Sequence, residues 1–182
     1  MFKNKIRHIL KTIILLFNML VLSVCIAQEK EYAVTKKGDT LYGKITRANS
    51  FLSPSKVRFK LKESNGNKRF LYPNGVETIY SLKGVDGECI IKSVYDKWFV
   101  KMIIDGKIKV YQQLDGVIFY TSKGHSEIKL TDFGGLNNRK DSHSRIRLLL
   151  KDNSEILKEF DALEGTQNNI LYIIEKYNNL EE

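Results

Sequence analysis

Cys89, His125 and Asp132 are residue types that support nucleophilic catalysis, but no short motif joins them. Cys89 could act as a thiol nucleophile, His125 as its base and Asp132 as the group that orients the base. The spacings of the G-x-S-x-G, phosphate-loop and H-E-x-x-H motifs are all missing from the chain. Cys89 also opens the apolar run Cys89-Ile90-Ile91, where a small buried hydrophobe is common. A hydrolase of unrecognised type, using Cys89 or loop carboxylates, is therefore the alternative hypothesis.

A stripe of alternating cations is the most distinctive charged feature. Its members are Lys56, Arg58, Lys60 and Lys62, separated by Val57, Phe59 and Leu61, and Lys68 and Arg69 accompany them across the following turn. This alternation is typical of a half-buried strand, which places the four cations on one face, about 7 Å apart. Such a ridge could bind lipid phosphates, an anionic glycan or an acidic partner. The alternative is a solvated face that protects a sheet edge from pairing.

Metal, cofactor and nucleic-acid sites are not predicted. The chain has 2 cysteines and 3 histidines, and their spacing is not that of a zinc site. No aromatic-rich motif accompanies the lysines of the cationic stripe, which argues against nucleic acid. We therefore expect no cofactor, and the expected partners are an envelope protein, a lipid or an anionic glycan.

Residues 1–27 have the layout of an export signal. The cationic start contains no acidic residue and carries Lys3, Lys5, Arg7 and Lys11. An apolar run from Ile13 to Val24 follows, and the small residues Cys25 and Ala27 suit cleavage before Gln28. The run is shorter than the roughly 20 residues that span a bilayer, so we expect no permanent transmembrane anchor after cleavage.

Export predicts a location in the periplasm or at the cell surface. Cys25 could instead carry a lipid, but the valine before it fits a lipoprotein signal poorly. Cleavage before Gln28 removes four basic residues from a chain of net charge +9, so the remaining protein is only mildly basic. Hydrophobic residues make up 42% of the chain, which is enough apolar surface to form a core.

Period-two patterns separated by turn residues dominate residues 28–132. The clearest strand covers residues 57–62, and Asp105-Gly106 and Lys123-Gly124 are typical hairpin turns. About eight or nine strands with short connections favour an antiparallel meander, either open or curled towards a barrel. We therefore predict one antiparallel β domain over residues 28–132.

Residues 133–182 change to a helical period. Residues 133–143 are predicted to be a connector, and residues 146–150 fit a helix and a strand equally well. Asp152 with Glu155 resembles a capping box, and Thr166 can cap a last helix. The two apolar stripes are Ile156, Leu157, Phe160 and Leu163, then Ile170, Ile173, Ile174 and Tyr177. The predicted fold class is α+β, with two or three C-terminal helices packed on the sheet.

The segment Val34–Ile45 contains the pattern G-D-T-x-x-G-x-I directly after the export signal. It resembles the opening of an uncharacterised exported β-rich protein family from Bacteroidota-type Gram-negative bacteria. Tyr72-Pro73 and the final Glu175-Lys176-Tyr177-Asn178 are similar too. The resemblance implies a Gram-negative envelope setting and supplies no catalytic or binding residue.

The glycines of this pattern also have a physical explanation. Gly38 suits a turn position with positive φ, and Gly43 permits a bulge or a close backbone approach. A loop that binds an anion through its backbone amides is the functional alternative. Taken together, the patterns predict a non-catalytic exported envelope protein that binds a partner protein, a lipid or a glycan.

Overall fold

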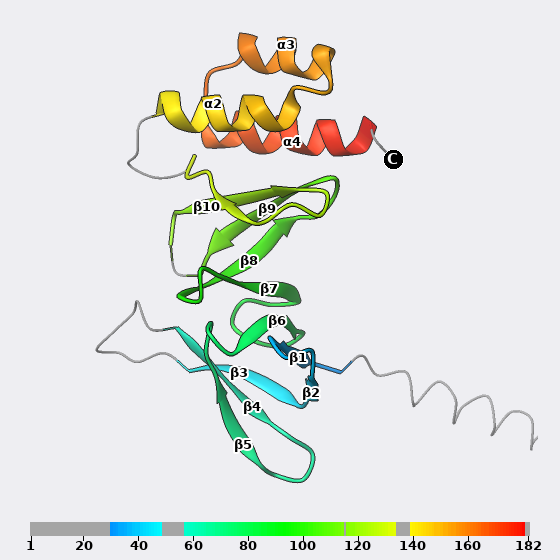
Figure 1. Ribbon diagram of the computed structural model, residues 1–182, viewed down its shortest axis with the longest axis vertical. Helices are drawn as coiled ribbons and strands as arrows, with labels where there is room; N and C mark the ends of the chain where they lie inside the picture. Colours follow the sequence, from blue (N-terminus) through cyan, green and yellow to red (C-terminus); the bar gives the residue numbers. More distant parts are fainter. Residues whose placement is uncertain (1–29, 49–56, 115, 134–138, 181–182) are drawn as a thin grey trace, which may run out of the picture. The chain divides into compact units, whose positions relative to one another are not determined.

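An open antiparallel sheet of eight strands, a separate three-stranded sheet and three C-terminal helices make up the fold (Figure 1). The computed structural model describes residues 30–48, 57–114, 116–133 and 139–180. Residues Glu31–Glu182 form one compact unit. The α+β class is confirmed. In the described residues the large sheet does not close into a barrel, because β2 and β11 are its two edges.

The large sheet contains most of the predicted meander. Its strands are β1 (Tyr32–Thr35), β2 (Thr40–Tyr42), β6 (Val76–Ser81), β7 (Cys89–Val94), β8 (Trp98–Ile104), β9 (Ile108–Gln113), β10 (Phe119–Lys123) and β11 (Lys129–Leu130). The spatial order is β11-β10-β9-β8-β7-β6-β1-β2, and every described pairing is antiparallel. From β6 to β11 each strand pairs with the next one along the chain, as a meander requires.

The small sheet was not foreseen from the sequence. It consists of β3 (Lys44–Ala48), β4 (Arg58–Lys62) and β5 (Lys68–Leu71), with β4 in the centre. Gly43 is the residue at which the chain leaves β2 and enters this sheet. A Cβ atom at Gly43 would lie 2.4 Å from the carbonyl oxygen of Lys62, so a larger residue does not fit. The close backbone approach predicted for Gly43 is confirmed.

Glu31 holds the two sheets together. Its carboxylate accepts hydrogen bonds from the N–H groups of Ile45 (2.7 Å), Leu82 (2.9 Å) and Lys83 (3.1 Å). Burial acts to raise the pKa of Glu31, but these three backbone donors and the Ser81 side chain hold that pKa below its usual value. The anion is therefore the form that joins the start of β3 to the end of β6.

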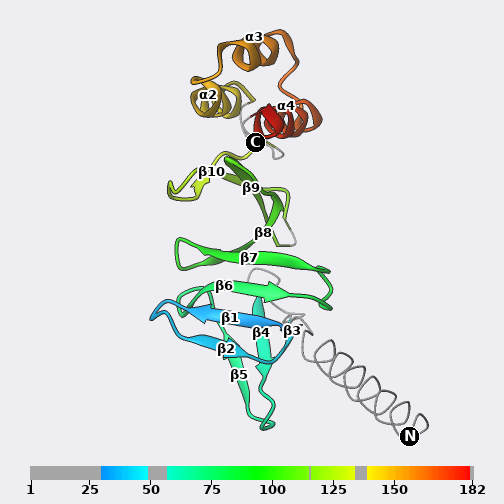
Figure 2. The ribbon, with the colours of Figure 1, turned by 90° about the vertical axis from the view of Figure 1, so that its right-hand side faces the viewer.

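One face of the large sheet, the covered face, forms two cores. Around β1, β6 and β7 it packs on the small sheet, whose strand β4 lies beside β1 in Figure 2. The residues Ile79, Ile91, Phe59 and Leu61 belong to this shared core. Around β9 and β10 the covered face packs on the helices. The strand registers place the partnered residues Val34, Thr78, Lys92 and Val100 on the opposite side, which is called the open face below. A third, smaller core of Val94, Val100, Tyr111 and Tyr120 lies on this side.

The helices are α2 (Arg139–Leu150), α3 (Ser154–Ala162) and α4 (Gln167–Leu180). Ile156 and Phe160 are buried on α3, as are the four predicted residues of the α4 stripe. The predicted connector is wrong in its last part, because α2 already begins at Arg139. His143 therefore lies on a helix, where its ring stacks on Phe160 with the centroids 4.1 Å apart.

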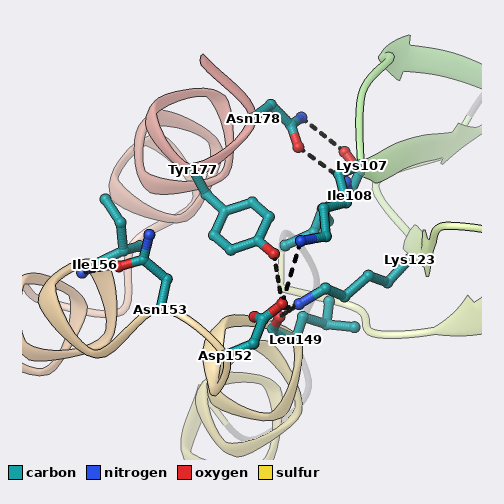
Figure 3. A network of polar contacts seen from close by, with 9 residues as sticks. All are labelled: Lys107, Ile108, Lys123, Leu149, Asp152, Asn153, Ile156, Tyr177 and Asn178. Carbon is teal, nitrogen blue, oxygen red and sulfur yellow. Dashed lines mark hydrogen bonds and ion pairs between the residues drawn. The ribbon is translucent and has the colours of Figure 1, made fainter. Parts of the chain in front are cut away.

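Asn153 rather than Asp152 caps α3. Its side chain accepts the Ile156 N–H at 3.1 Å, which leaves the Asp152 carboxylate free for other partners (Figure 3). Asp152 accepts hydrogen bonds from the Lys123 ammonium at 2.5 Å and the Tyr177 hydroxyl at 2.9 Å. Lys107 adds an ion pair at 3.4 Å. One carboxylate thus links the strand ends to the loop between α2 and α3 and to α4.

Asn178 makes a second link between α4 and the sheet. Its amide accepts the N–H of Ile108 and donates to the Ile108 carbonyl, both at 2.8 Å (Figure 3). A Cβ atom on the neighbouring Gly106 would come within 2.4 Å of this amide, so glycine is needed for the approach.

Replacing Gly43 with alanine tests the junction between the sheets. Because the new Cβ would press on a backbone carbonyl, we expect Gly43→Ala to lower the free energy of unfolding by about 1–3 kcal/mol. Gly75→Ala is the matched control, since its nearest backbone atom would be 3.8 Å away. Urea denaturation measures both variants. Equal stability of the two variants would contradict the close approach.

Asp152→Asn tests the helix attachment. Hydrogen bonding to Lys123 lowers the pKa of Asp152, so the stabilisation is complete above the usual value of 3.8 and is lost as the pH falls below it. We expect Asp152→Asn to cost about 1 kcal/mol at neutral pH, a small value because the side chain is 41% exposed.

Two results together identify the role of Asp152. The stability of the Asp152→Asn variant should depend less on pH in the acid range than that of the parent protein. Asp161→Asn is the control, because Asp161 is similarly exposed but its described ion pair is with Arg147 alone. Urea denaturation at several pH values measures the stability of both variants. The assignment would be contradicted if Asp152→Asn and Asp161→Asn lost the same free energy of unfolding.

Candidate functional site

The predicted basic ridge lies on the outer face of the small sheet. Phe59 and Leu61 of β4 are buried, and Arg58 and Lys60 alternate with them. Lys56 lies outside the described residues. Lys44 and Lys68 are the register partners of Lys62, so the neighbouring strands add two cations. We call this surface, made of Lys44, Arg58, Lys60, Lys62 and Lys68, the basic face.

Aromatic side chains accompany these cations. The guanidinium of Arg58 lies 4.5 Å from the centre of the Phe70 ring, and its Nε is buried with no hydrogen-bond partner in the described structure. The rings of Phe70 and Tyr72 are 6.4 Å apart, and both are exposed. The contact between Arg58 and Phe70 was not predicted from the sequence, because it joins two strands and depends on their register, in which Phe70 lies opposite Lys60.

The small sheet contains no charge that neutralises the basic face. None of the residues of β3, β4 and β5 is acidic. Arg69, predicted to accompany the stripe across the turn, instead lies opposite the buried Leu61, on the other face of the small sheet, and pairs with Glu63 at 2.5 Å. The basic face is therefore a cationic surface with exposed aromatic rings, which can bind an anionic surface by charge and by apolar contact.

A cavity of about 470 Å³ lies on the open face of the large sheet. Strands β6, β7, β9 and β10 and the loop Gly124–Ile128 form its walls. Among the residues that line it are Lys92, Tyr95, Lys109, Tyr111, His125 and Glu127. This cavity was not predicted, because it depends on how a loop lies across strands that are far apart in the sequence.

The structure does not bring Cys89, His125 and Asp132 together. Cys89 is 8% exposed and belongs to the core between the two sheets. His125 lines the cavity on the open face. The Asp132 N–H donates to the Phe119 carbonyl at 2.8 Å, at the end of the sheet that the helices cover. The proposed triad of Cys89, His125 and Asp132 is therefore not assembled.

The surroundings of Cys89 also disfavour a thiolate. Burial raises the pKa of the Cys89 thiol, and Lys101 opposes this effect while Asp86 adds to it. Asp86 itself forms a buried ion pair with Arg47 at 3.0 Å. We conclude that Cys89 is a core residue, as its apolar neighbours in the sequence indicate.

Comparisons with known proteins add no relative: no family model, no curated protein and no solved structure matches the chain. In the described part of the chain, none of the helices is long and apolar enough to span a bilayer. Within the same residues, no group of three or more His, Cys, Asp or Glu side chains is arranged to hold a metal ion.

The burial of Cys89 predicts slow reaction with thiol reagents. A chain carrying Cys25→Ser retains Cys89 as its only cysteine. We expect a chromogenic disulfide reagent to label it at least about tenfold more slowly in buffer than in urea, because the buried thiol is neutral. Rapid labelling of the folded protein would contradict the assignment of Cys89 to the core.

Proposed function

We propose that this chain is a non-catalytic exported envelope protein that binds anionic lipid headgroups through the basic face. The observation that carries the proposal is one sheet surface on which five cations surround the exposed rings of Phe70 and Tyr72, with no acidic residue in the three strands. The export-signal pattern of residues 1–27 and the resemblance of Val34–Ile45 to exported proteins support the envelope location.

A lipid surface matches this combination of side chains better than the other predicted partners. Each lysine near an anionic membrane contributes about 1 kcal/mol, so several moderate contacts add up without a deep pocket. Aromatic rings favour the boundary between headgroups and acyl chains. A soluble anionic glycan would pair with the charges, but the Arg58 guanidinium, 4.5 Å from the ring centre, already covers one face of Phe70 and so competes with a sugar ring there.

Vesicle co-sedimentation tests the proposal. The chain starting at Gln28 is the suitable form, because it contains the compact unit and lacks the apolar signal segment, which would bind membranes by itself. We expect it to bind phosphatidylglycerol vesicles and not phosphatidylcholine vesicles, and added salt should weaken the binding.

Charge reversal locates the binding surface. We expect Lys60→Glu with Lys62→Glu to weaken binding by at least about tenfold, since two contributions of about 1 kcal/mol are lost. The control, Lys37→Glu with Lys158→Glu, makes the same change in net charge at exposed positions outside the small sheet. Equal weakening by both pairs, or equal binding to both kinds of vesicle, would refute the proposal.

A further inference from the structure

The cavity on the open face has the size of a small-molecule site. Its volume of about 470 Å³ lies within the roughly 300–1,000 Å³ that such sites occupy. It is separate from the basic face, which lies on the outer side of the small sheet. The small sheet and the helices pack on the covered face, so neither occupies the cavity.

The polar groups in the cavity favour an uncharged ligand. Two lysines and two glutamates line it, together with serine hydroxyls and His125. Lys92 donates to the Thr78 hydroxyl at 2.6 Å and lies 3.9 Å from Glu77, and Lys109 pairs with Asp105. Both ammonium groups already have anionic partners, so the cavity has little net charge to offer an anion. It instead offers donors and acceptors close together, which suits hydroxyl groups.

Tyr95 in the cavity wall has a strained backbone. Tyr95 and Asp96 have φ values of 52° and 56°, and the Lys97 N–H donates to the Val94 carbonyl at 3.1 Å, which closes a two-residue hairpin turn. Asn-Gly suits such a turn, whereas a residue with a bulky side chain costs about 1 kcal/mol or more there. Tyr95 is 50% exposed, and its side chain is held in the cavity wall by two contacts: its hydroxyl accepts the Leu130 N–H at 3.2 Å, and its ring centroid lies 6.3 Å from that of Tyr120. Retained strain of this kind is a feature of binding sites.

A row of three tyrosines lies on the same face. Tyr32 is the register partner of both Tyr42 and Tyr80, and the ring centroids are 6.1 Å and 5.4 Å apart. β6 connects this row to the cavity, since Glu77 lines the cavity and Tyr80 follows three residues later, about 10 Å along the strand. The open face therefore offers several aromatic rings beside a polar cavity.

We propose that the open face binds an uncharged oligosaccharide, with one end in the cavity against Tyr95 and the rest across the tyrosine row. The C–H faces of sugar rings stack on aromatic rings, and each sugar hydroxyl both donates and accepts a hydrogen bond. The lysine and serine side chains of the cavity can donate hydrogen bonds to such hydroxyls, and the glutamate and serine side chains can accept hydrogen bonds from them. This site is independent of the lipid-binding proposal, because it uses other residues on another surface.

Calorimetric titration of the chain from Gln28 tests this inference. The probes are neutral malto-, cello-, xylo-, manno- and chito-oligosaccharides of increasing length. We expect at least one series to bind, with an affinity that rises with length as the sugar chain reaches the tyrosine row. The variant Lys60→Glu with Lys62→Glu should bind the same sugar unchanged, which separates this site from the basic face.

Tyr95→Asn distinguishes a binding residue from a structural one. We expect this variant to bind the sugar about tenfold more weakly or worse and yet to stay folded, because the strain that asparagine relieves in the turn offsets the lost hydrogen bond from Leu130. Tyr172→Asn is the matched control, since Tyr172 is also 50% exposed but lies on α4. It should leave sugar binding unchanged.

Three results would overturn the inference. The first is the absence of binding to every neutral series at millimolar sugar. The second is sugar binding that Tyr95→Asn leaves intact. The third is binding only to acidic sugars that is lost in the Lys60→Glu and Lys62→Glu variant, because the basic face would then be the sugar site.

Discussion

The junction of the two sheets depends on a carboxylate that accepts backbone N–H groups from both sides. The Glu31 carboxylate accepts hydrogen bonds from the N–H of Ile45 at the start of the small sheet and from those of Leu82 and Lys83 after β6. With Gly43 packed against the next strand, this sets the register of β3. Side chains alternate along a strand, so a shift of β3 by one residue would turn Lys44 inward and Ile45 outward. The register of β3 therefore keeps Lys44 on the basic face, opposite Lys62 of β4.

The two faces of the large sheet have different roles: the covered face packs on the rest of the protein, and the open face carries the cavity. The small sheet and the helices bury one side, and this burial supplies most of the apolar contact that stabilises the fold. The other side has the smaller core of Val94, Val100, Tyr111 and Tyr120. Beside that core lie groups that a core would not accept, such as the Lys92 ammonium and the strained Tyr95. The two proposed binding surfaces belong to different layers, so one ligand need not displace the other.

Local residue patterns predicted the strands and helices well, but they did not predict which residues distant in the sequence would contact one another. The α+β class, the strand at residues 57–62, the stripe on α4 and the close approach at Gly43 follow from side-chain period and backbone sterics. The separate small sheet and the cavity could not be predicted in this way, because both depend on how the strands pair. Asp152 shows the same limit: its sequence neighbours suggest a helix cap, whereas its partners lie 29 and 25 residues away.

The bond between Asn178 and Ile108 has a consequence for the order of folding. The two residues are 70 positions apart, so the backbone groups of Ile108 have no such partner until the last helix has been made and has docked. Hairpins between consecutive strands close first, because short loops lose less entropy. The apolar residues of β9 and β10 that await the helices are therefore uncovered longest. During synthesis they are the surface that a chaperone would meet.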